Sequence, residues 1–146
     1  MADIVANQLI ANGPRNWGYV FTNESDGTGE TNVVKVDGSA AGPLGVTVGG
    51  QIFYPLAHIK ITEIEYDISP GMKLQIIWDA TSSQIATVLG GTDKLHYWQF
   101  GGLAAVGSTG ALITGATGKI KFTTVGSTPG ASYTVYLRGT KGIPQS

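Results

Sequence analysis

Cysteine is absent from the 146 residues of this chain. Its absence excludes a disulfide framework, a thiolate metal site and a cysteine nucleophile. Histidine is scarce as well: His58 and His96 are the only two, and no His-Glu-x-x-His or facial-triad spacing surrounds them. We therefore expect no metal site and no cofactor, and we expect stability to come from packing or from assembly.

Charge is also scarce. Only 13% of the residues are charged, compared with about 25% in typical globular domains. Nine basic and ten acidic residues give a formal net charge of −1, which provides no long-range field to attract nucleic acid or anionic lipid. We expect no nucleic-acid partner. A surface with little net charge favours association with other proteins.

Long apolar runs are missing too. No stretch approaches the roughly 18 consecutive apolar residues of a membrane-spanning helix. The start of the chain, Met1 to Ile4, lacks the basic region and apolar core of a signal peptide. The expectation is a protein with no membrane partner that is made in the cytoplasm. Its length is typical of one domain with a sizeable core.

Strands with one apolar face are what the chain does contain. Residues 118–125 and 131–138 alternate apolar and polar side chains on either side of the breaker 126–130, a pattern that predicts a β-hairpin. Because each strand has one apolar face, it must pack on a second sheet. The apolar positions are Ile120, Phe122, Tyr133, Val135 and Leu137.

Similar short strands recur along the whole chain, without a long helical segment. Their number and spacing predict an all-β, single-domain β-sandwich that is jelly-roll-like, with about eight strands over residues 15–146 and an N-terminal arm over residues 1–14. Residues 38–57 show no clear period and are interpreted as a long irregular crossover. The predicted strands span residues 15–22, 31–37, 59–68, 72–78, 84–89, 94–100, 118–125 and 131–138.

The parity of the apolar residues predicts which side chains face the core. It slips by one near Thr62 and Glu63, which indicates a β-bulge. The turn 69–71 predicts a hairpin with the next strand, in which Asp67 lies across from Lys73. Other residues predicted to face inward are Trp17, Tyr19, Phe21, Val34, Val36, Ile64, Tyr66, Ile68, Met72, Leu74, Ile76 and Trp78.

The N-terminal arm carries four apolar side chains, Ile4, Val5, Leu9 and Ile10, before the breaker 12–14. This run is too short for a stable isolated helix, so it is either one helical turn or an extended arm. The apolar surface must be buried against the same chain, a neighbouring subunit or a capsid. We interpret these four residues as an assembly interface.

Three acidic residues, Glu63, Glu65 and Asp67, share one face of a predicted strand at about 7 Å spacing. Carboxylates roughly 6.5–9.5 Å apart suit an inverting glycosidase. Hydrolysis also needs one carboxyl group with a raised pKa in an apolar cleft, whereas this row belongs to the solvated face of an amphipathic strand. We therefore expect no catalytic residues and no enzymatic activity.

Three Trp and six Tyr residues leave room for a sugar-stacking surface. Most of these rings fall on core-facing parities, and His96 is interpreted as a half-buried strand residue. Tyr54, Trp98 and Tyr136 are the candidates for exposed aromatic contacts.

Four segments together resemble the small β-rich virion proteins of tailed bacteriophages: residues 33–37, 76–81, 118–126 and 132–137. The resemblance implies a non-enzymatic capsid decoration or cement subunit, a homo-oligomer that is present in many copies on the capsid surface of the virion. It also implies the major capsid protein as partner. The alternative is a tail- or fibre-associated module that binds a host glycan; an enzyme is the third possibility.

Overall fold

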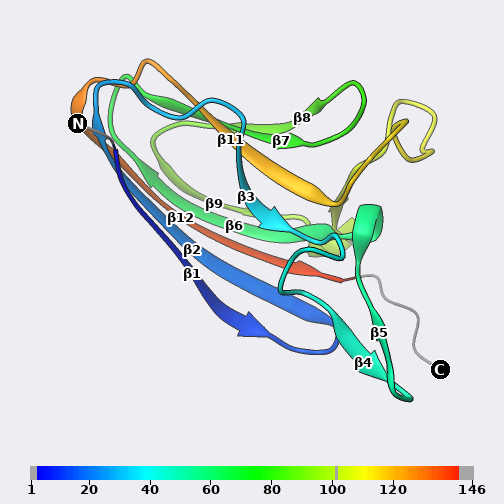
Figure 1. Cartoon of the computed structure of the whole chain (residues 1–146). Helices are drawn as coiled ribbons and strands as arrows, with labels where there is room; N and C mark the ends of the chain where they lie inside the picture. Colours follow the sequence, from blue (N-terminus) through cyan, green and yellow to red (C-terminus); the bar gives the residue numbers. More distant parts are fainter. Residues whose placement is uncertain (1–2, 101, 142–146) are drawn as a thin grey trace.

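Two antiparallel β-sheets pack face to face in the computed structural model, which describes residues 3–100 and 102–141 (Figure 1). The six-stranded sheet runs in the order β1-β2-β12-β6, and both β9 and β10 pair with β6. The four-stranded sheet runs β3-β11-β7-β8. The strands of the first sheet are β1 (Ile4–Asn12), β2 (Asn16–Asp26), β12 (Pro129–Thr140), β6 (Lys60–Ile68), β9 (Thr92–His96) and β10 (Leu103–Ala104).

The second sheet contains β3 (Val33–Asp37), β11 (Lys119–Val125), β7 (Lys73–Trp78) and β8 (Gln84–Leu89). A small hairpin of β4 (Val46–Val48) and β5 (Gln51–Phe53) stands apart from both sheets (Figure 1). Two single 3₁₀ turns complete the described elements, η1 (Leu56–His58) and η2 (Trp98–Phe100).

The connections between the sheets follow a jelly-roll path. Strands β2, β12, β6 and β9 form one layer, while β3, β11, β7 and β8 form the other. Along the chain, every connection between these eight strands crosses from one layer to the other, except the one between β7 and β8. These are the eight strands that the sequence predicts. The all-β sandwich is confirmed; β1, β4, β5 and β10 bring the total among described residues to twelve strands.

The core lies between the layers, where the predicted parity holds. Alternate residues of β2, β7, β11 and β12 are buried because each strand turns one face to the opposite sheet. Tyr66 is partly buried against the core. The largest fully buried side chains include Trp17, Trp78, Tyr133, Phe21 and Phe122.

The two predicted hairpins are wrong. Strands β11 and β12 lie in different sheets, as do β6 and β7, so the turns 126–128 and 69–72 carry the chain from one layer to the other. Parity could not distinguish these arrangements because both direct the same side chains inward. The predicted pair of Asp67 with Lys73 is therefore absent: Asp67 lies opposite Thr134 and Thr92, and Lys73 lies opposite Val125.

The predicted β-bulge at Thr62 is confirmed, since Arg138 lies opposite Glu63 whereas the next residue, Gly139, lies opposite Ile61. A second bulge was not predicted. Between the pairs Ile120–Val36 and Lys121–Val34, β3 has one additional residue, Lys35. This bulge reverses the parity, so that Lys35 is buried and Val34 is 43% exposed, contrary to the prediction for Val34.

Two further segments differ from expectation, and a third decides between two alternatives. Residues 38–57 contain the β4–β5 hairpin instead of a wholly irregular crossover. The strand predicted over residues 94–100 begins earlier and ends at His96, where a 3₁₀ turn follows, and His96 is exposed instead of half-buried. Residues 4–12 do not form the alternative helical turn: they are extended, as strand β1, and pair with β2.

Candidate functional site

Strand β1 forms one edge of the six-stranded sheet. It pairs antiparallel with β2 from Ile4 opposite Glu24 to Asn12 opposite Trp17, with a bulge at Ile10. Within the described part of the chain, no strand pairs with its other side. All nine residues of β1 are exposed, including the four predicted interface residues: Ile4 is 70% exposed and Ile10 48%.

Polar contacts hold β1 in place at both ends. The Asp3 carboxylate accepts hydrogen bonds from Asn23 Nδ2 at 3.1 Å and from the backbone N–H of Asp26 at 3.1 Å. At the opposite end, Asn12 Nδ2 donates to the Pro43 carbonyl oxygen at 3.1 Å, and Asn12 Oδ1 accepts from Lys141 Nζ at 2.5 Å. The strand is therefore fixed to its own subunit while its outer edge stays open.

A buried ion pair lies beside β1, between the two sheets. Lys35 Nζ is 2.5 Å from Glu30 Oε2, and the exposed fractions of these side chains are 1% and 6%. The Tyr133 hydroxyl donates to the other Glu30 oxygen, and burial together with this hydrogen bond raises the pKa of Tyr133 above its usual value. Lys35 Nζ also reaches Asn7 Oδ1 of β1 at 3.5 Å. Because every charge has a partner, the cluster is structural.

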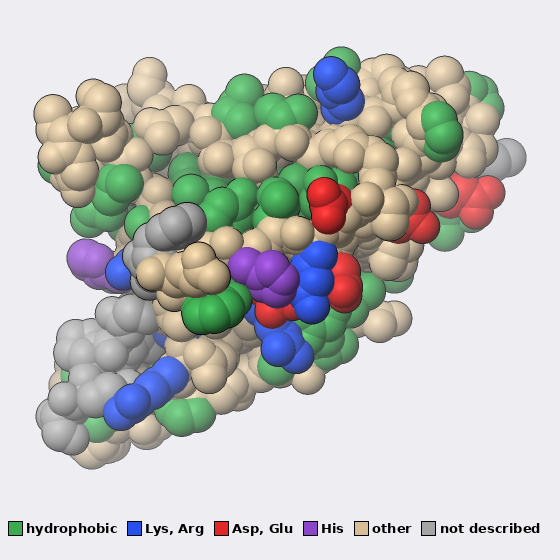
Figure 2. Space-filling model, turned by 180° about the vertical axis from the view of Figure 1, so that it is seen from behind, with side chains coloured by type: hydrophobic (Ala, Val, Ile, Leu, Met, Phe, Trp, Pro, Cys, Tyr) green, Lys and Arg blue, Asp and Glu red, His purple; other side chains and the backbone are tan. Residues whose placement is uncertain are grey.

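A groove of about 400 Å³ lies at the outer face of the six-stranded sheet, near β6 and β12. Trp98, 59% exposed, lines it together with Glu63 and Arg138. The indole Nε1 of Trp98 donates to Nδ1 of His96 at 3.3 Å. Figure 2 shows acidic, basic and histidine side chains gathered near the middle of one face of the molecule, with further charged side chains scattered toward the edges of that view.

The three aromatic residues predicted as exposed contacts do not share this groove. Tyr136 is half-buried, and its hydroxyl accepts a hydrogen bond from Arg138 Nε at 2.7 Å while the guanidinium lies over its ring. Tyr54 is half-buried beside Gly45, at the β4–β5 hairpin. Only Trp98 of the three lines the groove. One exposed ring is a small stacking surface.

The predicted row of carboxylates is present on β6. Lys94 Nζ of β9 lies 3.0 Å from Glu63 Oε1 and 3.7 Å from Glu65 Oε1, and Thr92 donates to Asp67. The hydrogen bond from Lys94 lowers the pKa of the Glu63 carboxyl. A general acid for glycoside hydrolysis needs the opposite shift, so this contact does not favour Glu63 as a general acid.

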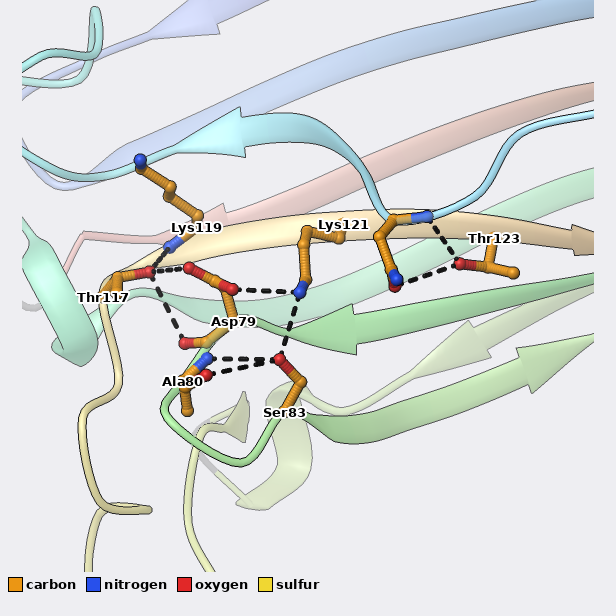
Figure 3. Close-up of polar contacts among 8 residues, drawn as sticks. Asp79, Ala80, Ser83, Thr117, Lys119, Lys121 and Thr123 are labelled. Atoms are coloured by element: carbon orange, nitrogen blue, oxygen red, sulfur yellow. Dashed lines mark hydrogen bonds and ion pairs between the residues drawn. The ribbon is translucent and has the colours of Figure 1, made fainter.

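A second polar cluster joins the end of β7 to β11 and to the β7–β8 turn (Figure 3). Asp79 Oδ1 lies 3.0 Å from Lys121 Nζ, and Asp79 Oδ2 accepts from Thr117 Oγ1 at 2.8 Å. Lys121 Nζ also donates to Ser83 Oγ at 3.1 Å. This resembles a serine–lysine dyad only in composition, because an ammonium held by a carboxylate has no lone pair to accept the serine proton.

The described residues contain no cluster of three or more His, Asp or Glu side chains that could hold a metal ion. His58 and His96 are both exposed. No helix within residues 3–100 and 102–141 has the length and apolar character needed to cross a membrane.

Comparison of the chain with protein-family models and with curated protein sequences finds no match. The surfaces of the protein are therefore the main evidence for its function. Two of these stand out: the uncharged edge formed by β1 and the groove beside Trp98. The sequence pointed to both, through Ile4, Val5, Leu9 and Ile10 for the edge and through Trp98 for the groove.

Proposed function

We propose that this chain is a non-enzymatic virion structural protein, a decoration or cement subunit on the capsid surface of a tailed bacteriophage. It would be a homo-oligomer whose partner is the major capsid protein. The observation that carries the proposal is the open edge of β1, which displays exposed apolar side chains on a strand held firmly by its own subunit.

Three properties support an assembling role over a catalytic one. An unpaired strand edge with apolar side chains is a ready template for association with another chain. The charged clusters that the molecule does contain, around Lys35, Lys94 and Lys121, are neutralised within the subunit. The jelly roll is itself an architecture that virus capsid domains use, although a fold alone does not establish a function.

The test is binding to phage heads. Heads of the phage that encodes this chain, prepared without the protein, are mixed with the purified chain and separated by sedimentation. We expect saturable binding at a fixed number of copies per head and greater resistance of the filled heads to heat. Leu9→Lys should weaken binding, whereas Val88→Lys, an equivalent change on exposed β8, should not. Failure of the wild-type chain to bind the heads contradicts the proposal.

A second candidate is a tail- or fibre-associated module that binds a host glycan, and the groove beside Trp98 is the observation that favours it. An exposed indole can stack on the apolar face of a sugar ring, while Glu63 and Arg138 could bind hydroxyl groups. Titration with host-surface oligosaccharides tests it: binding that Trp98→Ala abolishes supports this candidate over capsid decoration.

A further inference from the structure

The edge of β1 lacks the usual protections against strand pairing. Natural edge strands carry lysine, proline or inward-pointing charges, and residues 4–12 contain neither a charged residue nor proline. The bulge at Ile10 leaves a regular edge from Ile4 to Leu9, about 20 Å long at 3.4 Å per residue. No other strand of the described residues pairs with this edge, so its outward-facing backbone N–H and C=O groups have no partner strand there.

We propose that β1 pairs antiparallel with β1 of a second copy of this chain, about a two-fold axis that passes between the two copies of Asn7. The pairing would join two six-stranded sheets into one continuous sheet across the dimer. This inference rests on the proposed function, because it names the contact through which the subunits associate. A two-fold contact between identical edges is self-complementary, so each edge is used up and association stops at the dimer.

The faces of β1 restrict the possible registers. Val5, Asn7 and Leu9 lie opposite Asn23, Phe21 and Tyr19, which are buried, so these three residues are on the core-side face of the sheet. Ile4, Ala6 and Gln8 are on the outer face. A two-fold axis perpendicular to the sheet preserves the faces, so each residue must lie opposite one from its own face. The axis can therefore pass through Ala6, Asn7 or Gln8, but not between two residues.

Side-chain chemistry selects Asn7 among these three. An axis at Asn7 places Val5 opposite Leu9 of the second copy, an apolar cross-strand pair that occurs twice by symmetry. An axis at Gln8 would place Asn7 opposite Leu9, and an axis at Ala6 would place Val5 opposite Asn7. On the core-side face, both of those registers set the Asn7 amide against an aliphatic side chain. The axis at Asn7 confines such a contact to the outer face, where the small side chain of Ala6 lies opposite Gln8.

Asn7 is also suited to lie opposite itself. A carboxamide has both a donor and an acceptor, so two identical ones can hydrogen-bond across the axis. Lys35, whose Nζ lies 3.5 Å from Asn7 Oδ1, is neutralised by Glu30 at 2.5 Å and is buried. The two subunits therefore approach without bringing uncompensated like charges together at the axis.

Strand β8, an uncharged edge of the four-stranded sheet, is less suited to self-pairing. A bulge interrupts its pairing with β7 at Ala86, in the middle of the strand. Gln84 at its start donates to the Val106 carbonyl oxygen at 3.1 Å, which places the loop around residues 106–114 beside that end. Strand β8 therefore provides a control edge.

Single-cysteine variants of the full-length chain test the register, because the natural sequence has no cysteine. A disulfide requires Cα atoms about 4.4–6.8 Å apart. In the proposed register, Asn7→Cys forms a cross-linked dimer on mild oxidation. Val5→Cys and Leu9→Cys alone do not, since the same residue in the two copies is about 13 Å apart along the strands, but their mixture does. Ile85→Cys on β8 stays monomeric.

Sedimentation over a concentration series tests the association itself. The wild-type chain should form a dimer that dissociates on dilution, and Val5→Lys should remain monomeric with an unchanged circular dichroism spectrum. A wild-type chain that is monomeric throughout the series overturns the proposal, as does cross-linking of Val5→Cys with itself but not of Asn7→Cys. A monomer that still binds phage heads would overturn the β1 pairing while leaving the decoration function intact. A dimer that does not bind heads would leave the β1 pairing intact and contradict the decoration function.

Discussion

Lys35 and Glu30 form an ion pair in the interior of the sandwich, with 2.5 Å between Nζ and Oε2 and almost no exposure of either side chain. The pair exists because the bulge in β3 turns Lys35 inward, where it meets the Glu30 carboxylate. The same carboxylate accepts a hydrogen bond from the Tyr133 hydroxyl. The placement replaces an apolar core position with a charged one. The stability of the sandwich therefore depends on both partners of the ion pair being present.

Removing only the lysine should be strongly destabilising. Lys35→Met leaves the Glu30 carboxylate buried without a counter-charge, and we expect the free energy of unfolding to fall by about 3–5 kcal/mol. Adding Glu30→Gln to Lys35→Met removes the unpaired charge and should recover most of the loss. Urea unfolding measures both, with Lys73→Met on the exposed side of β7 as the control. A loss below about 1 kcal/mol for Lys35→Met would contradict the buried pair.

The two tryptophans Trp78 and Trp98 should respond very differently to truncation. Trp78 is 2% exposed at the end of β7, so Trp78→Ala should cost about 3–5 kcal/mol in the free energy of unfolding, as cavity-forming changes do. Trp98 is mostly exposed, and Trp98→Ala should cost less than about 1 kcal/mol. Equal effects of the two changes in denaturant unfolding would refute the assigned core.

The decrease in the free energy of unfolding at acid pH should depend on Asp79. Hydrogen bonds from Lys121 and Thr117 lower the pKa of Asp79 in the folded state. The Asp79 carboxylate therefore stabilises the fold at pH values above its unfolded-state pKa of about 4. This stabilisation is lost as the pH falls through the lower pKa of the folded state. Asp79→Asn should cost up to about 1 kcal/mol at pH near 7. The cost should shrink toward pH 2.

Chemical denaturation at several pH values measures this difference. In a Lys121→Met background, the effect of Asp79→Asn should vary less with pH because the strongest partner of Asp79 is gone. A difference between Asp79→Asn and the wild type that stays constant from neutral to acid pH would rule out the assigned coupling.

We expect no turnover of polysaccharides. Lys94 lies beside Glu63 and Glu65, and its hydrogen bond lowers the pKa of the Glu63 carboxyl. A proton donor to a leaving sugar would have to be protonated at neutral pH. Incubation with host-surface polysaccharides and reducing-end detection is the measurement. Turnover that is lost in a folded Glu65→Gln variant would establish a catalytic role and contradict this expectation.

The sequence predicts the layers of this fold better than its pairings. Alternation identifies the inward side chains of β2, β7, β11 and β12 because burial of one face is a local property of each strand. Which strands are neighbours depends on where a turn sends the chain, and the same parity fits both a hairpin and a crossing between sheets. The adjacent β11 and β12 therefore read as a hairpin although they lie in different layers.

The sequence contains a local signal for the β4–β5 hairpin that the prediction of an irregular crossover over residues 38–57 does not use. Gly49 and Gly50, both with positive φ, separate Val48 from Gln51, and two such glycines between short β-prone runs favour a two-residue hairpin turn. That signal predicts β4 and β5. The bulge at Lys35 has no comparable signal, because a buried lysine is recognisable only once its partner Glu30 is placed beside it.

The position of β12 determines when the molecule can fold. The last strand of the sandwich is inserted between β2 and β6 (Figure 1), where residues 16 and 140 pair with each other. The six-stranded sheet cannot close until β12 has left the ribosome, because its two halves meet only through this strand. The apolar faces of β2 and β6 stay uncovered during that interval, so chaperone access and translation speed, more than final stability, should limit the yield of native protein.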